Sequence, residues 1–265
     1  MASSAVTLRP TIDRVWLEQA AVVDPISHAL ALWDLDHFPD RVRFVSAVRG
    51  DATVGYLLVW LGHPTTPIVH WFGATEDARA LVDGLPTRPL VAIVPEEIGP
   101  DVERARGPVV VHPLLRLVAE GRDALPADAP REEVRRLTRA DRPGLLTLSA
   151  GRNDMVVSEY PYVDPEEEAV WGCFEDGRLC GVARTLVRRP NLWILGGVYV
   201  DPTARGRGYG VAVVRAAVED ARREGAAVAL YVREDRTAAR VVYERAGFRA
   251  RGRQVWVDAG AHLEP

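Results

Sequence analysis

The chain has 265 residues, of which 48% are apolar and 26% are charged, and its formal net charge is −4. This length suits two domains, and this composition is ordinary for a water-soluble globular protein. The slightly acidic balance gives no global basic field, so we expect no nucleic-acid partner. No apolar run approaches the roughly 20 residues of a membrane-spanning helix, and the start of the chain lacks the basic and apolar regions of a signal peptide. We therefore expect no membrane association and a cytoplasmic location.

All 33 basic residues are arginine, since the sequence contains no lysine. A Walker-type nucleotide loop, a pyridoxal phosphate enzyme and a protein kinase each depend on a lysine at a defined place. The composition therefore excludes these three classes.

The N-terminal part begins with a predicted hairpin, in which Val42–Val48 pairs with Thr53–Trp60 around a turn at Gly50. Further strands are predicted at Ile68-Val69 and at Leu90–Val94. These short apolar runs, separated by turn residues, are typical of strands.

A linker is predicted at residues 122–131, which are rich in Ala, Pro and Asp. We therefore predict a first domain over residues 1–121 and a second domain over residues 132–265.

The second domain alternates strand-like and helical patterns. The predicted strands are 134–137, 169–174, 179–187, 192–200, 227–232, 248–251 and 254–257. The predicted helices are 141–150, 209–224 and 237–246. We expect Asp141 to be the N-cap of the first helix, and the second helix to bury Val214 and Val218 while exposing Arg215 and Asp220.

Two cysteines, Cys173 and Cys180, flank a hairpin turn predicted at Asp176-Gly177. Counting outward from the turn pairs Glu175 with Arg178, Phe174 with Leu179, and Cys173 with Cys180. We expect the two thiols to be reduced cross-strand neighbours, with a disulfide or a redox role as the alternative. Two cysteines without a nearby pair of histidines make a poor zinc site, so we expect no metal.

A glycine-rich turn follows the strand 192–200 and leads directly into the helix 209–224. It consists of Arg205, Gly206, Arg207, Gly208, Tyr209 and Gly210. Such a turn presents several backbone N–H groups at the positive end of a helix dipole, which suits a diphosphate. The glycines do not follow the Gly-x-Gly-x-x-Gly spacing of a dinucleotide-binding Rossmann fold, so we do not favour that fold.

The N-terminal part repeats the strand pattern of the second domain without the glycine turn. Gly55 corresponds to Gly181 at a shift of 181 − 55 = 126, and Ile68 corresponds to Ile194 at the same shift. The strand at Leu90 corresponds to Ala227 at a shift of 227 − 90 = 137. We interpret this as a duplication whose first copy cannot hold a nucleotide. Chance similarity between two βα units is the alternative.

The second domain resembles the GNAT superfamily of acetyl-CoA-dependent N-acetyltransferases. The family's cofactor motif is Arg or Gln, two residues, Gly, one residue, then Gly or Ala, and residues 205–210 match it. The preceding strand end, Val198 to Pro202, and the later segment Tyr243 to Phe248 are also similar to the family's patterns. The resemblance implies an α/β fold with a mixed sheet, the acyl-CoA N-acyltransferase fold, in tandem with a degenerate N-terminal copy.

The resemblance also implies residue roles. Backbone N–H groups of residues 207–211 would hold the diphosphate of acetyl-CoA, Val198 and Val200 would pair with its pantetheine, and Tyr243 would face the sulfur. The family often has Asn where this chain has Arg236, so Arg236 either serves the cofactor or is solvated. The implied cofactor-binding residues are Val198, Val200, Arg205, Gly206, Arg207, Gly208, Tyr209, Gly210, Val211 and Arg236, and Tyr243 is the implied catalytic residue.

The general base is not identified by the sequence, because the strand 192–200 has no Glu, Asp or His. Glu159, Glu168 and Glu175 are candidates, and a water chain is equally compatible with the chemistry. We also expect the acidic run 166–168 to favour cationic acceptors, and the segment 159–162 to line the acceptor site.

The predicted function is transfer of an acetyl group from acetyl-CoA to the primary amine of a small molecule or peptide. A non-catalytic acyl-CoA sensor or assembly module is the alternative. We also allow for a homodimer, for which the sequence gives no direct sign.

Overall fold

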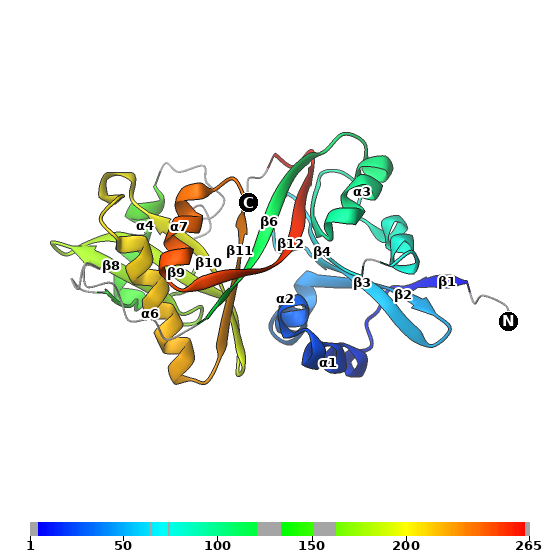
Figure 1. The fold of residues 1–265 in the computed structure, drawn as a ribbon, viewed down its shortest axis with the longest axis horizontal. Helices are drawn as coiled ribbons and strands as arrows, with labels where there is room; N and C mark the ends of the chain where they lie inside the picture. The colour runs from blue at the N-terminus through cyan, green and yellow to red at the C-terminus, as the bar shows by residue number, and fades with distance from the viewer. Residues whose placement is uncertain (1–4, 64, 74, 121–133, 151–162, 263–265) are drawn as a thin grey trace. The chain divides into compact units, whose positions relative to one another are not determined.

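The structure is a computed structural model that describes residues 5–63, 65–73, 75–120, 134–150 and 163–262 (Figure 1). The chain divides into two compact units. The first unit is Met1–Leu114 with Arg253–Leu263, and the second is Leu115–Gly252 with Glu264–Pro265. The predicted linker 122–131 lies outside the described residues. Arg253–Leu263 belong to the first unit in this division, whereas the prediction placed them in the second domain over residues 132–265.

The first unit is a mixed sheet with helices on both faces. Its elements are β1 (Val6–Arg9), α1 (Arg14–Val23), α2 (Pro25–His37), η1 (Pro39–Arg41), β2 (Val42–Arg49), β3 (Ala52–Trp60), β4 (Ile68–Phe72), η2 (Asp77–Gly84), β5 (Leu90–Val94), η3 (Glu96–Ile98), α3 (Gly99–Arg106) and the start of β6 (Val110–Ala119). Strands β1 to β4 pair antiparallel in sequence order, and β4 pairs parallel with β5. The neighbour of β5 is the last strand of the chain, β12 (Phe248–Ala259), whose residues 255–259 pair antiparallel with it.

The second unit has a similar sheet. Its elements are β7 (Val134–Arg136), η4 (Arg139–Asp141), α4 (Arg142–Ser149), β8 (Val170–Glu175), β9 (Arg178–Arg189), β10 (Leu192–Val200), η6 (Pro202–Ala204), α6 (Tyr209–Arg223), β11 (Ala227–Arg233) and α7 (Thr237–Arg245). The strand order is β7-β8-β9-β10-β11-β6, with β10 and β11 parallel.

Helices cover both faces of this second sheet. The pair α6 and α7 packs in one cluster with Trp171 and Trp193, whereas α4 packs in another with Val170 and Val182 (Figure 1). Trp171 and Val170 are consecutive on β8, so the two clusters lie on opposite faces.

Most predicted elements of the second unit are confirmed, with three corrections. Asp141 is the N-cap residue of α4 as predicted, but its side chain makes no capping bond to that helix: its carboxylate accepts from the N–H of Thr138 and from Arg135, and so closes the preceding turn. Arg215 is buried rather than exposed, because its Nη2 reaches the carbonyl of Arg245. The two predicted final strands are one continuous strand, β12.

The predicted repeat is visible in the strand registers of the two units. Gly55 lies opposite Ala47 and Gly181 lies opposite Cys173, and both pairs differ by 126 (181 − 55 and 173 − 47). The register shifts directly after Ala47 in one hairpin and after Cys173 in the other. Two hairpins with the same irregularity at the same repeat position favour duplication over chance similarity.

The two repeats differ between their parallel strands. Ile68 lies opposite Val91 and Ile194 lies opposite Ala229, so the shift grows from 194 − 68 = 126 to 229 − 91 = 138. The first unit is therefore 138 − 126 = 12 residues shorter here. Among its described residues it has only η2 at this place, where the second unit has the glycine turn and α6. No helix in the described part of the chain is long and apolar enough to span a membrane.

Candidate functional site

Strand β10 separates from β11 halfway along its length. The parallel ladder ends at Leu195, opposite Leu230, although the two strands continue to Val200 and Arg233. On the other side, the register with β9 shifts between Gly196 and Tyr199. The two strands therefore splay, as predicted, and Val198 and Val200 lie on the splayed part. Of the strands that the structure describes, none is in register with the β11 side of β10 beyond Leu195.

The glycine turn begins directly after this splayed segment. The Asp201 side chain accepts hydrogen bonds from the N–H and Oγ1 of Thr203, at 2.8 and 2.6 Å, and so fixes the chain as it leaves β10. Nε of Arg205 donates to the carbonyl of Val200 at 3.2 Å. The motif arginine therefore ties the turn to the strand end.

Gly206 and Gly208 have the left-handed backbone that favours glycine, with φ of +80° and +85°. A Cβ atom at Gly206 would meet no heavy atom within 4 Å. The turn therefore needs glycine at these positions for its backbone shape, and at Gly206 it leaves open space beside the main chain.

Helix α6 starts at this turn without a side-chain cap. Gly208 is its N-cap residue and, having no side chain, it gives no capping bond to the N–H groups of the first turn. Those N–H groups have no partner within the helix and carry the positive end of its dipole. Gly210 has a different role, since a Cβ atom there would lie 3.3 Å from Val242 on α7. It allows the two helices to pack closely, while Val211 is buried between helix and sheet.

Arg207 and Tyr209 both bond to Glu175, at the end of β8. Tyr209 is 4% exposed and its hydroxyl donates to Oε1 of Glu175 at 2.9 Å. Nη1 of Arg207 pairs with the same oxygen. The hydrogen bond from Tyr209 and the nearby Arg207 charge lower the pKa of Glu175. Such a carboxylate is a poor general base, so the structure does not support that predicted role for Glu175.

Tyr243 is the buried residue of α7 and packs in the core of the second unit, where it is 8% exposed. Its ring packs edge to face with Phe248 at a centroid distance of 6.0 Å. Burial raises the pKa of its phenol above the ordinary value, so the group stays protonated at neutral pH. Arg236 is exposed at the N-cap position of the same helix.

The two cysteines are not directly opposite each other. Glu175 pairs with Arg178 and Phe174 with Leu179 as predicted, but Cys173 lies opposite Gly181. A register shift after Cys173 inserts Cys180 as an additional residue, which corrects the prediction. Both cysteines are free and buried under the glycine turn with Tyr209, and burial raises the pKa of the Cys173 thiol to about 12.

The acidic run 166–168 carries its own counter-charges. Arg139 lies 3.5 Å from Glu166 and 3.8 Å from Glu167, and Arg184 lies 2.8 Å from Glu168. Arg139 also pairs with Asp164 at 2.9 Å, so two arginines face four carboxylates and the predicted acidic rim keeps part of its negative charge. The preference for cationic acceptors stays a prediction. The candidate base Glu159 and the segment 159–162 lie outside the described residues.

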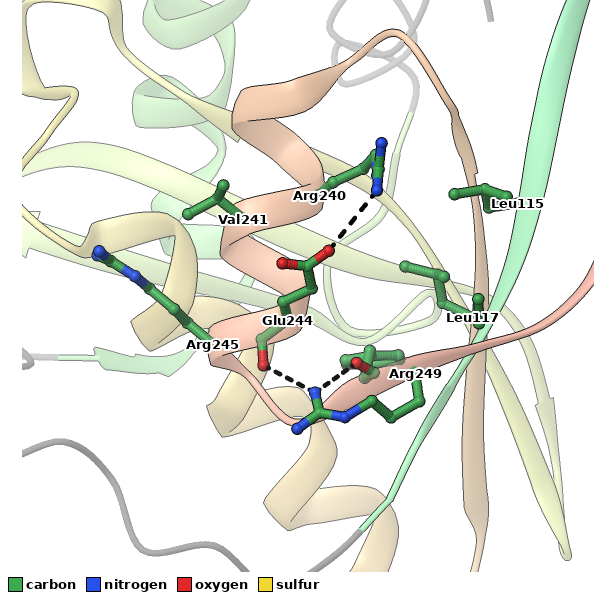
Figure 2. A pocket seen from close by; sticks show the side chains of 9 residues that line it. Leu115, Leu117, Arg240, Val241, Glu244, Arg245 and Arg249 are labelled. Atoms are coloured by element: carbon green, nitrogen blue, oxygen red, sulfur yellow. Dashed lines mark hydrogen bonds and ion pairs between the residues drawn. The ribbon is translucent and has the colours of Figure 1, made fainter.

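A groove of about 510 Å³ lies beside α7 (Figure 2). Glu244 lies 3.8 Å from Arg240, and Nη1 of Arg249 donates to the carbonyl of Glu244 at 3.3 Å. The lining residues are Leu115, Leu117, Arg240, Val241, Glu244, Arg245, Phe248, Arg249 and Ala250. None of the predicted cofactor-binding residues lines this groove, so it is distinct from the glycine turn.

Sequence reasoning missed the contact between Glu175 and the glycine turn. The hairpin signal at Asp176-Gly177 places Glu175 at a strand end. It gives no information on the contact with residues 207 and 209, because these are more than 30 positions away and meet Glu175 only through tertiary packing.

Comparison with known proteins finds a family match within the second unit. Residues 132–248 match the family model described as acetyltransferase (GNAT) family. No curated protein matches the sequence significantly.

Several solved structures have a similar fold. A protein from Drosophila has a TM-score of 0.67 at 15% identity, over 97% of this chain and 98% of its own. A tandem GNAT protein from the clavulanic acid biosynthesis pathway has a TM-score of 0.60 at 18% identity, over 96% and 99%. A GNAT-family protein from Novosphingobium aromaticivorans has a TM-score of 0.53 at 24% identity, over 76% and 86%. At these identities the structures establish the fold, which is that of a C-terminal GNAT domain with a GNAT-like N-terminal region.

Proposed function

Because residues 132–248 match the model of the GNAT acetyltransferase family, which supports an acyl-CoA-dependent acyltransferase, we propose that this protein transfers an acetyl group from acetyl-CoA to a primary amine. The observation that carries the proposal is the uncapped start of α6 at a glycine turn, directly after the splayed end of β10. A diphosphate site and an extended backbone edge then lie next to each other, which suits a ligand with a diphosphate and a long amide-containing arm.

In this proposal the N–H groups of residues 207–211 hold the diphosphate. The backbone of Val198 and Val200 pairs with the pantetheine arm, in the gap that β11 leaves. Gly206 and Arg205 shape the turn, and Arg236 lies at the start of α7 as a further charge for the cofactor.

The reaction is attack of a neutral amine on the thioester carbonyl. The new C–N bond forms, the C–S bond breaks, and the amine proton leaves to a base or to water. A backbone N–H near Val200 is the proposed donor to the oxyanion. Tyr243 donates a hydrogen bond to the departing sulfur, and its raised pKa favours hydrogen bonding over full proton transfer.

A non-catalytic acyl-CoA-binding module is the second candidate. The ion pairs of two candidate bases favour this module, since Glu168 pairs with Arg184 and Glu175 pairs with Arg207. A water-mediated base keeps the enzymatic proposal compatible with these contacts.

The test combines calorimetry with coenzyme A and turnover of acetyl-CoA with a panel of amines. We expect binding and turnover, whereas binding without turnover would favour the sensor. Gly206→Ala should weaken binding, because alanine strains a left-handed backbone by about 1 kcal/mol and adds a methyl group beside the main chain.

The matched control for this variant is Gly225→Ala. Gly225 has φ of +79° and open space around it, at the opposite end of α6. It should lose similar stability without losing affinity. Equal effects of the two substitutions on coenzyme A binding would contradict the proposed site.

A further inference from the structure

One carboxylate oxygen is bonded to both sequence neighbours of Gly208. Oε1 of Glu175 accepts from the hydroxyl of Tyr209 at 2.9 Å and also pairs with Nη1 of Arg207. Gly208 itself has φ of +85° and precedes the first turn of α6. We infer that Glu175 is a positioning residue that holds this backbone turn in the shape that binds the diphosphate. The inference rests on the proposed function, because it assigns a residue to that same site.

The buried tyrosine makes this contact more than a surface ion pair. The Arg207 side chain is 53% exposed, and an exposed pair of this kind contributes little by itself. Tyr209, in contrast, packs in a cluster with Cys173, Cys180 and other buried side chains. Its ring cannot turn without opening that cluster, so its hydroxyl fixes the position of Glu175. Glu175 in turn restrains Arg207.

Electrostatics alone would give Glu175 the opposite effect. A carboxylate near a diphosphate repels it, so removing the charge should tighten binding if Glu175 had no positional role. If Glu175 holds the turn, removing its charge should weaken binding, since charge-assisted hydrogen bonds to Tyr209 and Arg207 are lost. The two explanations therefore predict changes of opposite sign.

The experiment compares Glu175→Gln with Asp176→Asn by calorimetry with coenzyme A. Asp176 is the adjacent exposed residue, and Asn tolerates its left-handed backbone, so this control removes the same charge from the same hairpin. We expect about tenfold weaker binding for E175Q and no change for D176N. In acetyl-CoA turnover the effect of E175Q should appear mainly as a higher KM for acetyl-CoA, whereas general misfolding would lower kcat and leave that KM unchanged.

Tyr209→Phe tests the same contact from the other side. It should also weaken the binding of coenzyme A. The double variant E175Q/Y209F should bind coenzyme A no more weakly than the single variant with the lower affinity, because both substitutions act on one hydrogen-bond network. Binding by E175Q that equals or exceeds that of the wild type would overturn the inference, as would additive losses in the double variant.

A readout without ligand separates this inference from the proposed function. Amide hydrogen exchange at Ala212, whose N–H donates to the carbonyl of Gly208 at 3.0 Å, should be faster in ligand-free E175Q than in D176N and the wild type. If the wild type does not bind coenzyme A, the proposed function fails, while faster exchange still supports the restraint by Glu175. Unchanged amide exchange in E175Q would overturn the inference that Glu175 restrains the turn.

Discussion

The phenol of Tyr243 is buried, and burial changes what it can contribute to acyl transfer. Its raised pKa keeps it protonated across neutral pH, so it can donate a hydrogen bond but is a weak acid. Tyr243→Phe should therefore lower kcat about tenfold or more and change the KM for acetyl-CoA much less. The pH profile of kcat between pH 6 and 9 should keep its shape, because the phenol does not titrate there.

The control for this variant is Tyr56→Phe, which removes one hydroxyl from a tyrosine 2% exposed in the first unit. It should cost stability, since that hydroxyl lies 3.0 Å from Nδ1 of His28, but leave kcat unchanged. A Tyr243→Phe enzyme with wild-type kcat would show that the tyrosine is only a core residue.

Among the elements, the contact between α6 and α7 depends on the absence of a side chain at position 210. A methyl group there would lie 3.3 and 3.4 Å from the two methyl groups of Val242. Gly210→Ala gains helix propensity of about 1 kcal/mol but loses packing. We expect the substitution to stabilise the protein more in a Val242→Ala background than in the wild type. Urea unfolding of the four variants measures this coupling, and additive effects would contradict it.

Sequence patterns predicted the elements around the site but not their irregularities. Strand β10 and helix α6 follow from apolar periodicity and the glycine turn, and the observed bounds agree within one residue. The shift at Cys173 and the bulge after Gly196 could not be predicted, because register depends on neighbouring strands. The contact of Glu175 with residues 207 and 209 was missed for the same reason. The continuity of β12 was missed because Gly252 and Arg253, between the two predicted strands, resemble a turn.

On the scale of the whole molecule, the C-terminal residues are part of the first unit's core. Val255 and Val257 of β12 are buried against β5, in the same cluster as Leu90 and Ala92. Removing residues 253–265 should destabilise the first unit by about 3 kcal/mol or more, since at least two buried valines are lost. Amide hydrogen exchange, measured separately on peptides from β4 and β5, should be faster in this truncated protein than in the full chain. Removal of residues 260–265 alone is the control, and equal protection in both truncations would contradict this assignment.

The late position of β12 in the chain also affects how the protein is made. Val94 is synthesised 255 − 94 = 161 residues before its strand neighbour Val255. While the ribosome is still translating, the earlier half of the polypeptide lacks a strand and exposes the open edge of β5, which is prone to aggregation. The sheet of the first unit is therefore complete only after β12 has been synthesised, and long-range pairing of this kind slows folding. A nascent chain stalled before residue 253 would be a natural client for chaperones that shield exposed strand edges.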